Sequence, residues 1–310
     1  MSKTLVFGHK NPDTDAIGAA IAFAAFQNAR GKDYEAVALG EPGDETLFAL
    51  NTFNVDAPRI IQTAKDETDQ VALVDHNEFQ QSVDDIEELE VVSVVDHHRI
   101  DNFKTPQPLF YRAEPVGCTS TIIAKMFKEK DLDIPKEIAG IMLSAIVSDT
   151  LLFKSPTSTP EDEKVARKLA EIADVDIDKY GLEMLKAGAD VSNMSAEEIL
   201  EGDAKTFNIK DNNIRIGQVN VVDIDDILTR KDELVAEMQR LSADSAYNLY
   251  FLVITNILTN DSVGIVLGEK ADLVNEAFET DLVDSIIELP GVVSRKKQVV
   301  PQLTEVLENM

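Results

Sequence analysis

All four histidines of the chain stand beside aspartates, and these clusters are the part of the sequence best suited to chemistry. They lie in three segments: GHKNPDTD (His9, Asp13, Asp15), VALVDHNE (Asp75, His76) and VVSVVDHHR (Asp96, His97, His98). Imidazole nitrogens and carboxylate oxygens are ligands for manganese, zinc, iron or cobalt, and no cysteine accompanies them here. The residue types therefore predict a site for divalent metal ions.

A fourth candidate ligand is Asp149, at the end of the apolar stretch IMLSAIVSDT. Several carboxylates at one point repel one another, and bound dications relieve that repulsion. One carboxylate can also bridge two metal ions ~3.5–4 Å apart, a spacing that holds an attacking hydroxide against a phosphoryl group. The clusters thus favour phosphoryl chemistry at a metal centre.

Each aspartate also has an ordinary structural interpretation. Asp15 could be the N-cap of the alanine-rich helix that follows it, and Asp75 and Asp96 could be turn residues after strands. Three clusters that together hold every histidine favour a common site over three unrelated turns. For His76 two interpretations stay open, a metal ligand or a structural residue beside the ligands.

The elements that must position these residues are short apolar runs. Each cluster directly follows one of them: Leu5–Phe7, Val71–Val74 or Val91–Val95. Continuous apolar runs of this length suit a parallel sheet buried on both faces, and ligands of such sheets bind outside the carboxyl ends of the strands. We therefore predict an α/β fold in which an N-terminal parallel sheet, with helices on both faces, brings the clusters together.

The rest of the chain divides into two regions around the small, polar segment 189–194. We predict a metal-binding domain over 1–188, a flexible linker over 189–194 and a smaller α/β domain over 195–310. Strands are expected near Ala36–Leu39, Ala204–Ile209, Ile214–Val221, Leu249–Thr255 and Ser262–Leu267, and a loop over Thr105–Gly117. Helices are expected near Ala16–Arg30, Glu45–Leu50, Ser120–Glu129, Lys136–Val147, Glu161–Ala173, Ile177–Ala187 and Ile227–Leu241, with a last one after Pro301.

A second constellation lies near the C-terminus, where Arg295, Lys296 and Lys297 follow one another. They could discourage edge pairing of a strand or form a solvated face. They could equally clamp phosphate, since arginine offers paired donors and lysine a point charge. Lys205 could join such a clamp, although alone it looks like any surface lysine.

Composition narrows the classes of function. The 310 residues are 44% hydrophobic, enough for a substantial core, and carry 57 acidic against 29 basic side chains, a net charge of −28. Such a chain should repel nucleic acid and anionic membranes. P-loop, dinucleotide-binding and nucleophile-elbow motifs are absent from the sequence. The single Cys118 and the absence of a long apolar run predict a cytoplasmic protein, with Cys118 buried in a structural role.

The segments GHKNPDTDAIGAA, VDHNE, VVDHHR, SDT and SRKKQ, in this order, make the chain resemble a family II inorganic pyrophosphatase of the DHH phosphoesterase superfamily. The resemblance covers essentially the whole length. It implies hydrolysis of pyrophosphate to two phosphates by a hydroxide that bridges two manganese or cobalt ions, in a cleft between two domains. It also implies that additional magnesium arrives with the substrate, and that two copies form a homodimer through the N-terminal domain.

The resemblance also implies roles for individual residues. His9, Asp13 and Asp75 would bind one metal ion, and the other would be bound by Asp15, Asp75, His97 and Asp149. His98, Lys205, Arg295 and Lys296 would contact the substrate, with His98 as a candidate general acid, whereas Lys297 has no assigned contact. The alternatives are another DHH phosphoesterase acting on short RNA, adenosine bisphosphate or short polyphosphate, and a non-catalytic protein that binds metal or phosphate.

Overall fold

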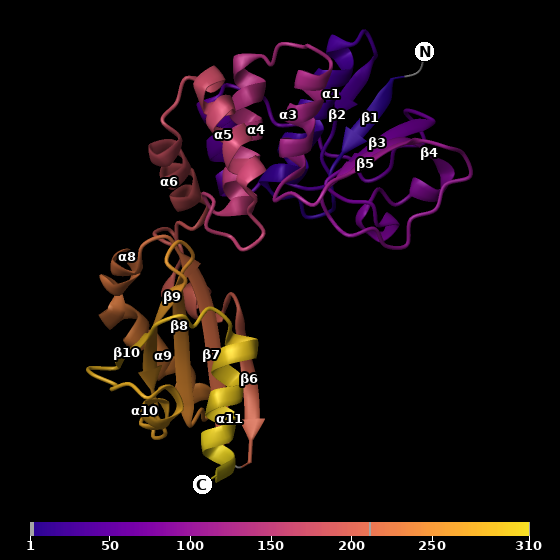
Figure 1. Cartoon of the computed structure of the whole chain (residues 1–310). Coiled ribbons are helices and arrows are strands. Elements are labelled where there is room, and N and C mark those ends of the chain that lie inside the picture. The colour runs from indigo at the N-terminus through magenta and orange to yellow at the C-terminus, as the bar shows by residue number, and fades with distance from the viewer. Residues whose placement is uncertain (1–2, 211, 310) are drawn as a thin grey trace. The chain divides into compact units, whose positions relative to one another are not determined.

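The structure is a computed structural model that describes residues 3–210 and 212–309. The chain forms two compact units, the first ending at Gly188 and the second beginning at Ala189. Each unit is built around its own five-stranded sheet (Figure 1). No helix among the described residues is long and apolar enough to cross a membrane.

The first unit alternates strands and helices along the chain. Its strands are β1 (Thr4–Phe7), β2 (Tyr34–Ala36), β3 (Gln70–Val74), β4 (Glu90–Asp96) and β5 (Phe110–Ala113). Its helices are α1 (Thr14–Ala29), α2 (Asp44–Thr52), α3 (Thr119–Glu129), α4 (Lys136–Thr150), α5 (Pro160–Ala173) and α6 (Ile177–Gly188), with 3-10 turns at Phe79–Gln81 and Ile86–Glu88.

The sheet of the first unit is parallel throughout, in the order β2-β1-β3-β4-β5. Helices α1 and α3 pack on one face, with α4 and α5 packed in turn against them (Figure 1). The opposite face buries Leu5, Phe7 and Leu73 against Ile61 and Val83, from the irregular segments around β3. The predicted α/β fold with a parallel N-terminal sheet is confirmed. The second face is covered largely by turns and irregular segments.

Two local predictions in the first unit were wrong. The segment Thr105–Gly117, expected to be a loop, contains β5, because a short edge strand has one neighbour only and needs no long apolar run. The second strand covers Tyr34–Ala36 rather than Ala36–Leu39, and Ala38 makes only an isolated bridge to Ile60.

The second unit has a mixed sheet, in the order β10-β9-β8-β7-β6. Within the described part of this unit, β7 and β8 are the only parallel pair, and the other pairs are antiparallel. Its strands are β6 (Ala204–Ile209), β7 (Asn212–Val221), β8 (Leu249–Asn256), β9 (Asp261–Leu267) and β10 (Ile286–Leu289). Its helices are α7 (Ala196–Glu201), α8 (Ile224–Leu228), α9 (Lys231–Ser245), α10 (Leu273–Phe278) and α11 (Val300–Asn309), with a π-helical turn at Arg295–Val299.

Both faces of the second sheet are covered by helices. On one face Leu234 of α9 packs with Tyr250 of β8, and on the other Leu303 of α11 packs with Phe251. The helix expected over Ile227–Leu241 is two helices, because α8 ends at Leu228 and α9 begins at Lys231. The short elements α7, α10 and β10 were not predicted, since four to six residues carry too little periodicity to be recognised.

Candidate metal centre

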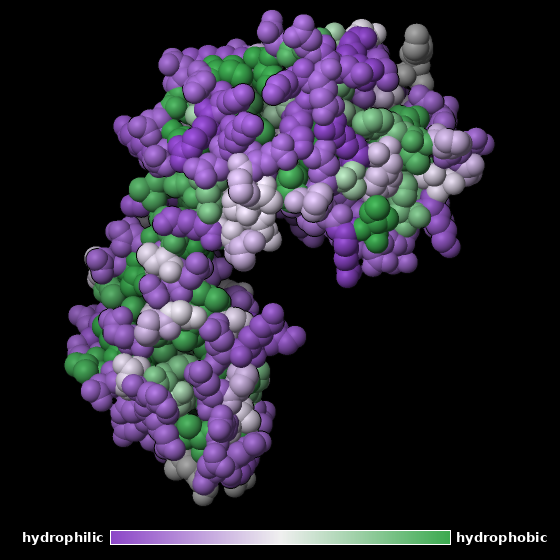
Figure 2. All heavy atoms as spheres, in the orientation of Figure 1, coloured by the Kyte–Doolittle hydropathy of each residue, from purple (hydrophilic) through white to green (hydrophobic). Residues whose placement is uncertain are grey.

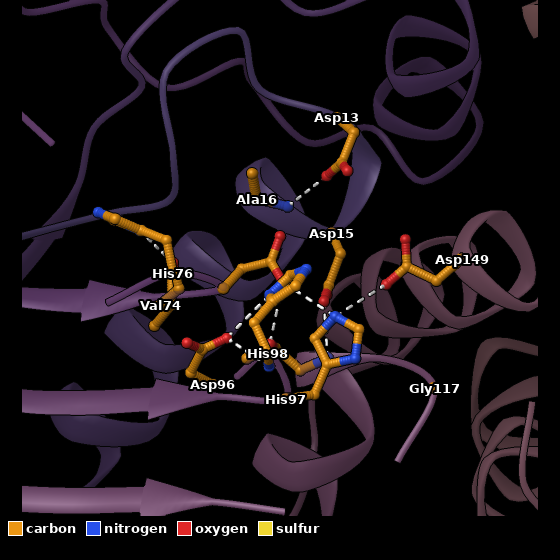
Figure 3. A network of polar contacts seen from close by, with 12 residues as sticks. Asp13, Asp15, Ala16, Val74, His76, Asp96, His97, His98, Gly117 and Asp149 are labelled. Carbon is orange, nitrogen blue, oxygen red and sulfur yellow. Dashed lines mark hydrogen bonds and ion pairs between the residues drawn. The ribbon is translucent and has the colours of Figure 1, made fainter. Parts of the chain in front are cut away.

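The three histidine and aspartate clusters meet at the carboxyl ends of β1, β3 and β4, where the parallel sheet was expected to place them (Figure 3). Two helix N-termini, of α1 and α3, and the C-terminal end of α4 complete the surroundings. The site is thus assembled from segments that are far apart in the chain but fixed by one sheet.

The β1–α1 loop supplies His9 and Asp13. Gly8 permits the tight entry, because a Cβ on it would lie 2.5 Å from the carbonyl oxygen of Ala16. His9 donates from Nδ1 to the carbonyl of Lys10 (2.9 Å), which leaves Nε2 3.5 Å from Asp13 Oδ2 and 3.5 Å from Asp75 Oδ2. The N-cap of α1 is Asp13, whose Oδ1 accepts from the Ala16 amide at 2.9 Å, so this role does not fall to Asp15.

Asp75 lies at the middle of the cluster, directly after β3. Its φ of 58° is a left-handed conformation that is uncommon for residues other than glycine and concentrates at functional sites. One carboxylate oxygen faces His9, and the other lies 3.4 Å from His97 Nε2 and accepts from Thr119 Oγ1 at 3.1 Å. The side chain, 1% exposed, is therefore placed between two imidazoles.

Asp15 is completely buried and is held by the N-terminus of α3. Its carboxylate accepts from the backbone amides of Thr119 (2.6 Å) and Ser120 (3.1 Å) and from Ser120 Oγ (2.7 Å). Amides at a helix N-terminus favour a negative charge. The α3 helix therefore fixes Asp15 in one orientation.

Asp149 approaches from the end of α4. Its Oδ2 is buried, has no hydrogen-bond partner among the described residues, and lies 3.9 Å from His97 Nε2. Burial, reinforced by the charges of Asp15 and Asp75, raises the pKa of Asp149 well above its usual range. A buried carboxylate oxygen without a partner costs free energy, so this atom marks a place where a cation fits.

The same surroundings shift the other groups. Burial lowers the pKa of His9, but hydrogen bonds to Asp13 and Asp75 outweigh it and raise the pKa to about 11. For His97, too, the hydrogen bond to Asp75 outweighs burial and raises the pKa to about 9. Burial and the charge of Asp75 raise the pKa of Asp15 to about 7. A dication at this place would displace such protons and supply the positive charge instead.

Among the residues that the structure describes, possible ligand atoms fall into three groups in which all atoms lie within 4.8 Å of one another. The groups are His9, Asp13 and Asp75; Asp15, His97 and Asp149; and Asp75, His97 and His98. The donors are nitrogen and oxygen without sulfur, a set that suits manganese and related divalent ions. The residues present therefore fit the metal centre expected from the sequence.

His98 is held by a residue whose role the sequence left open. Asp96, fully buried, accepts at Oδ1 from the His98 amide and from His98 Nδ1, both at 3.0 Å. Its Oδ2 accepts from Asn77 Nδ2 at 2.6 Å. His98 Nδ1 is thus engaged, whereas Nε2 has no hydrogen-bond partner among the described residues, and the ring borders a small pocket of about 160 Å³ that His9, Asp75 and Arg99 also line.

The contacts of His76 favour a structural residue over a metal ligand. It donates from Nδ1 to the carbonyl of Val74 (2.8 Å), and Nε2 accepts from Ser82 Oγ (2.8 Å), so both ring nitrogens have protein partners. The ring is 3% exposed and lies 6.1 Å from Phe7, centroid to centroid. Burial lowers the pKa of His76 to about 4, which keeps the ring neutral.

The predicted cations of the second unit gather at one end of its sheet. Arg295 donates to the carbonyl of Asp203 and, at 2.7 Å, to its carboxylate, and the guanidinium side chain is only 9% exposed. This contact brings the start of β6, which carries Lys205, next to the turn that carries Lys296. Both lysines are exposed, as is Lys297.

Several residues of the site were not found from the sequence. Thr119 and Ser120 hold Asp15 and Asp75, and Asp162 of α5 accepts from the Gly117 amide at 2.9 Å and so fixes the turn before α3. The signal was present in VGCTST, where small hydroxyl residues open a helix and can present amides to an anion. Cys118 in that segment is buried, as predicted.

Comparisons with known proteins agree with this geometry. The family model of the DHH family N-terminal domain matches residues 3–146, and that of the DHHA2 domain matches residues 182–306. Manganese-dependent inorganic pyrophosphatases are similar over nearly the whole chain. One from Listeria monocytogenes is 59% identical, covering 98% of this chain and 99% of its own, and one from Enterococcus faecalis is 58% identical, covering 99% of each.

Solved structures show the same relationship. A Methanococcus jannaschii protein described as a family II inorganic pyrophosphatase matches with a TM-score of 0.62 and 38% identity, covering 98% of this chain and 99% of its own. An exopolyphosphatase-related protein from Bacteroides fragilis matches with a TM-score of 0.53 at 13% identity, covering 99% of this chain and 92% of its own, a likeness of fold alone.

Proposed function

The chain belongs to the manganese-dependent inorganic pyrophosphatases of the DHH family, and from this premise we propose how it hydrolyses pyrophosphate to two phosphates. The observation that carries the proposal is Asp75, held between His9 and His97 with the unpartnered oxygen of Asp149 close by. Such an arrangement presents one carboxylate to two neighbouring ligand groups.

In the proposal two of these ligand groups would each hold one manganese ion, which cobalt could replace. His9, Asp13 and Asp75 would hold one ion, and Asp15, His97 and Asp149 would hold the other, with Asp75 close enough to contribute to both. Metal ions so held lower the pKa of water and neutralise charge on phosphoryl oxygens. Additional magnesium enters with the substrate.

The chain's own residues orient the substrate. Asp96 holds Nδ1 of His98, so that Nε2 of His98 is directed to the oxygen between the two phosphorus atoms and serves as the candidate general acid. Lys205, Arg295 and Lys296 contact phosphoryl oxygens and stabilise the charge that develops there. A guanidinium carries five N–H donors, so Arg295 retains donors beyond those engaged with Asp203.

These cations reside in the second unit. In the proposal the predicted domains 1–188 and 195–310 therefore both contact the substrate, and the predicted linker 189–194 lets them do so. Arg230 Nη1 donates to the carbonyls of Val191 (3.0 Å) and Met194 (2.8 Å), which ties this segment to α8 and α9. Gly188 is a poor place to stiffen it, because a Cβ there would lie 2.8 Å from Cβ of Glu45. Asn193→Pro is the better variant for testing whether turnover needs linker motion.

We also propose that the homodimer expected from the family resemblance forms through the N-terminal unit. There β5 is an edge strand paired only with β4, and Phe110 on it is 48% exposed. An unpaired strand edge is a ready template for another chain. Phe110→Asp should convert the dimer to a monomer in light scattering. The single buried cysteine is in keeping with the proposed cytoplasmic location.

Phosphate release tests the proposed function directly. The manganese-loaded protein is offered pyrophosphate, tripolyphosphate, short RNA and adenosine bisphosphate at equal concentrations, with the magnesium-only protein as a control. We expect pyrophosphate to be the preferred substrate. Faster release from RNA or adenosine bisphosphate would assign another DHH activity, and metal uptake without release from any substrate would assign a binding protein.

A further inference from the structure

A pocket of about 370 Å³ lies between α3 and α5, away from the proposed metal ligands. Its apolar wall comes from Leu132 and Ile134, just after α3, and from Val165, Leu169 and Ile172 of α5. The last three have the i, i+4, i+7 spacing of one helix face, and Ile172 is 41% exposed. Figure 2 shows hydrophobic atoms exposed among hydrophilic ones on the N-terminal unit. We call the pocket lined by these residues the α3–α5 pocket.

Lysines form the rim of the α3–α5 pocket. Lys128 of α3 and Lys164 and Lys168 of α5 are exposed, and none of them has an ion pair among the described residues. A fourth, Lys125, is engaged with Glu114 and, at 3.0 Å, with Glu161. These three cations stand out against the net charge of −28, and among the described residues that line the pocket only Asp131 and Asp133 offer unpaired negative charge beside them.

These features define the chemistry of an occupant. The volume lies within the range of small-molecule sites. The apolar wall is aliphatic, and no aromatic side chain of the described part of the chain lines the pocket, so it offers a nucleobase no stacking surface. An aliphatic chain, in contrast, can cover this wall while an anionic head reaches the free lysines.

We propose that the α3–α5 pocket binds an aliphatic anion, a chain of medium length that ends in a carboxylate or phosphate, and that its occupancy is communicated to the metal centre along α3. The binding step depends only on the pocket, whereas the communication rests on the proposed metal ligands.

The α3 helix provides the connection. Its C-terminal half carries Lys125 and Lys128 at the pocket, while its first residues, Thr119 and Ser120, hold Asp15. A ligand inserted between α3 and α5 acts on a helix whose other end fixes a proposed metal ligand. A shift of a few tenths of an ångström at that end changes hydrogen bonds of 2.6–3.1 Å.

Calorimetry on the manganese-loaded protein tests the binding step, with decanoate as the probe and octanoate, acetate and decanol as comparisons. We expect decanoate to bind, each added methylene to strengthen binding by up to about fourfold, and acetate and decanol to bind far more weakly. Decanol binding as tightly as decanoate would overturn the role of the lysines, and no decanoate binding would overturn the proposal as a whole.

Two double variants locate the binding. Lys164→Ala with Lys168→Ala should weaken decanoate binding by about tenfold, since each exposed ion contact contributes little by itself. The matched control is Lys179→Ala with Lys186→Ala on α6, which removes the same charge and should change nothing. Equal weakening by both pairs would show a general charge effect and contradict a site between α3 and α5.

Manganese affinity tests the communication. We expect the dissociation constant for manganese to change by at least threefold with saturating decanoate in the wild type, and not in the Lys164/Lys168 variant. Binding of decanoate with an unchanged manganese affinity would overturn this half of the proposal. Since neither readout is turnover, failure here is distinct from failure of the proposed pyrophosphatase activity.

Discussion

Two clusters differ in how their side chains are held. The acidic cluster of the first unit comprises the candidate metal ligands, and the basic cluster of the second comprises Lys205, Arg295, Lys296 and Lys297. Asp75 is 1% and His97 14% exposed, and both are held by neighbours on separate elements. Lys205 and Lys296 are exposed side chains without ion pairs among the described residues. Ligand geometry in the first cluster is thus fixed by the fold, whereas in the second cluster only Arg295 is held, by Asp203, and in the proposed function the substrate would order the two lysines.

The difference teaches how an acidic protein can use a highly charged anion. Metal ions require several carboxylates at fixed distances, and this arrangement is expensive without the ions because like charges repel. Phosphoryl oxygens accept cations over many geometries, so long flexible lysines suffice. Loss of a fixed ligand should therefore do more damage than loss of a mobile cation.

The largest expected effect is at Asp75. Asp75→Asn keeps the shape but removes the charge between His9 and His97, so both proposed ions lose a ligand. We expect manganese content to fall below one ion per chain and turnover to fall by on the order of 10³-fold or more. Elemental analysis of the purified protein and phosphate release measure the two effects. Normal manganese content with normal turnover would remove Asp75 from the centre.

Lys296→Ala should give the next largest effect and a different pattern. Loss of one charge-stabilising donor lowers kcat/KM by about 10²-fold, while the manganese dissociation constant stays within about twofold because the lysine belongs to the other unit. The matched control is Lys297→Ala, an adjacent exposed lysine with no assigned contact, which should lower kcat/KM by no more than about threefold. Equal loss in both variants would show that these lysines act through general positive charge and not through specific substrate contacts.

Asp96→Asn tests a residue between these two cases, since Asp96 is buried but holds the half-exposed His98. The asparagine places an amide opposite Asn77 Nδ2 and removes the charge that holds His98 Nδ1. We expect kcat to fall by about 10- to 100-fold with little change in manganese affinity.

A double-variant comparison separates positioning from general damage. If Asp96 acts through His98, Asp96→Asn combined with His98→Ala should be no slower than His98→Ala alone. Additive losses, or loss of manganese from Asp96→Asn, would contradict a positioning role.

Sequence patterns predicted the parts of the molecule that depend on long or apolar elements. The runs Val71–Val74 and Val91–Val95 were recognisable as buried strands, and the parallel sheet they form explains why clusters from distant segments meet. The edge strand β5 and the short elements of the second unit escaped because they bury little and have no clear period.

Partners of the candidate ligands were harder to predict. The hydrogen bonds of Ser120 to Asp15 and of Asn77 to Asp96 join residues 105 and 19 positions apart, and no local pattern encodes such pairs. Arg295 shows the same limit, since its sequence neighbours suggested a free cation and the fold gives it Asp203.

The smallest expected effect on turnover is at His76, which stands next to Asp75 but has both ring nitrogens engaged by Val74 and Ser82. His76→Gln should keep turnover at pH 7 within about threefold, provided that it folds. Its effect should be on stability in acid instead. A histidine whose pKa falls from about 6.5 unfolded to about 4 folded stabilises the protein above pH 6.5 and loses that contribution as the pH falls to 4.

Denaturant unfolding of metal-free wild type and His76→Gln, at pH 7 and at pH 4.5, isolates this contribution, because the other titrating groups are common to both proteins. The unfolded wild type takes up a proton at His76 below pH 6.5 and the variant cannot, so the wild type should lose up to about 3 kcal/mol more than the variant on acidification. A constant difference between the two proteins would show that His76 titrates normally. Loss of manganese from the variant at pH 7 would instead show that His76 belongs with its neighbour Asp75 among the metal ligands.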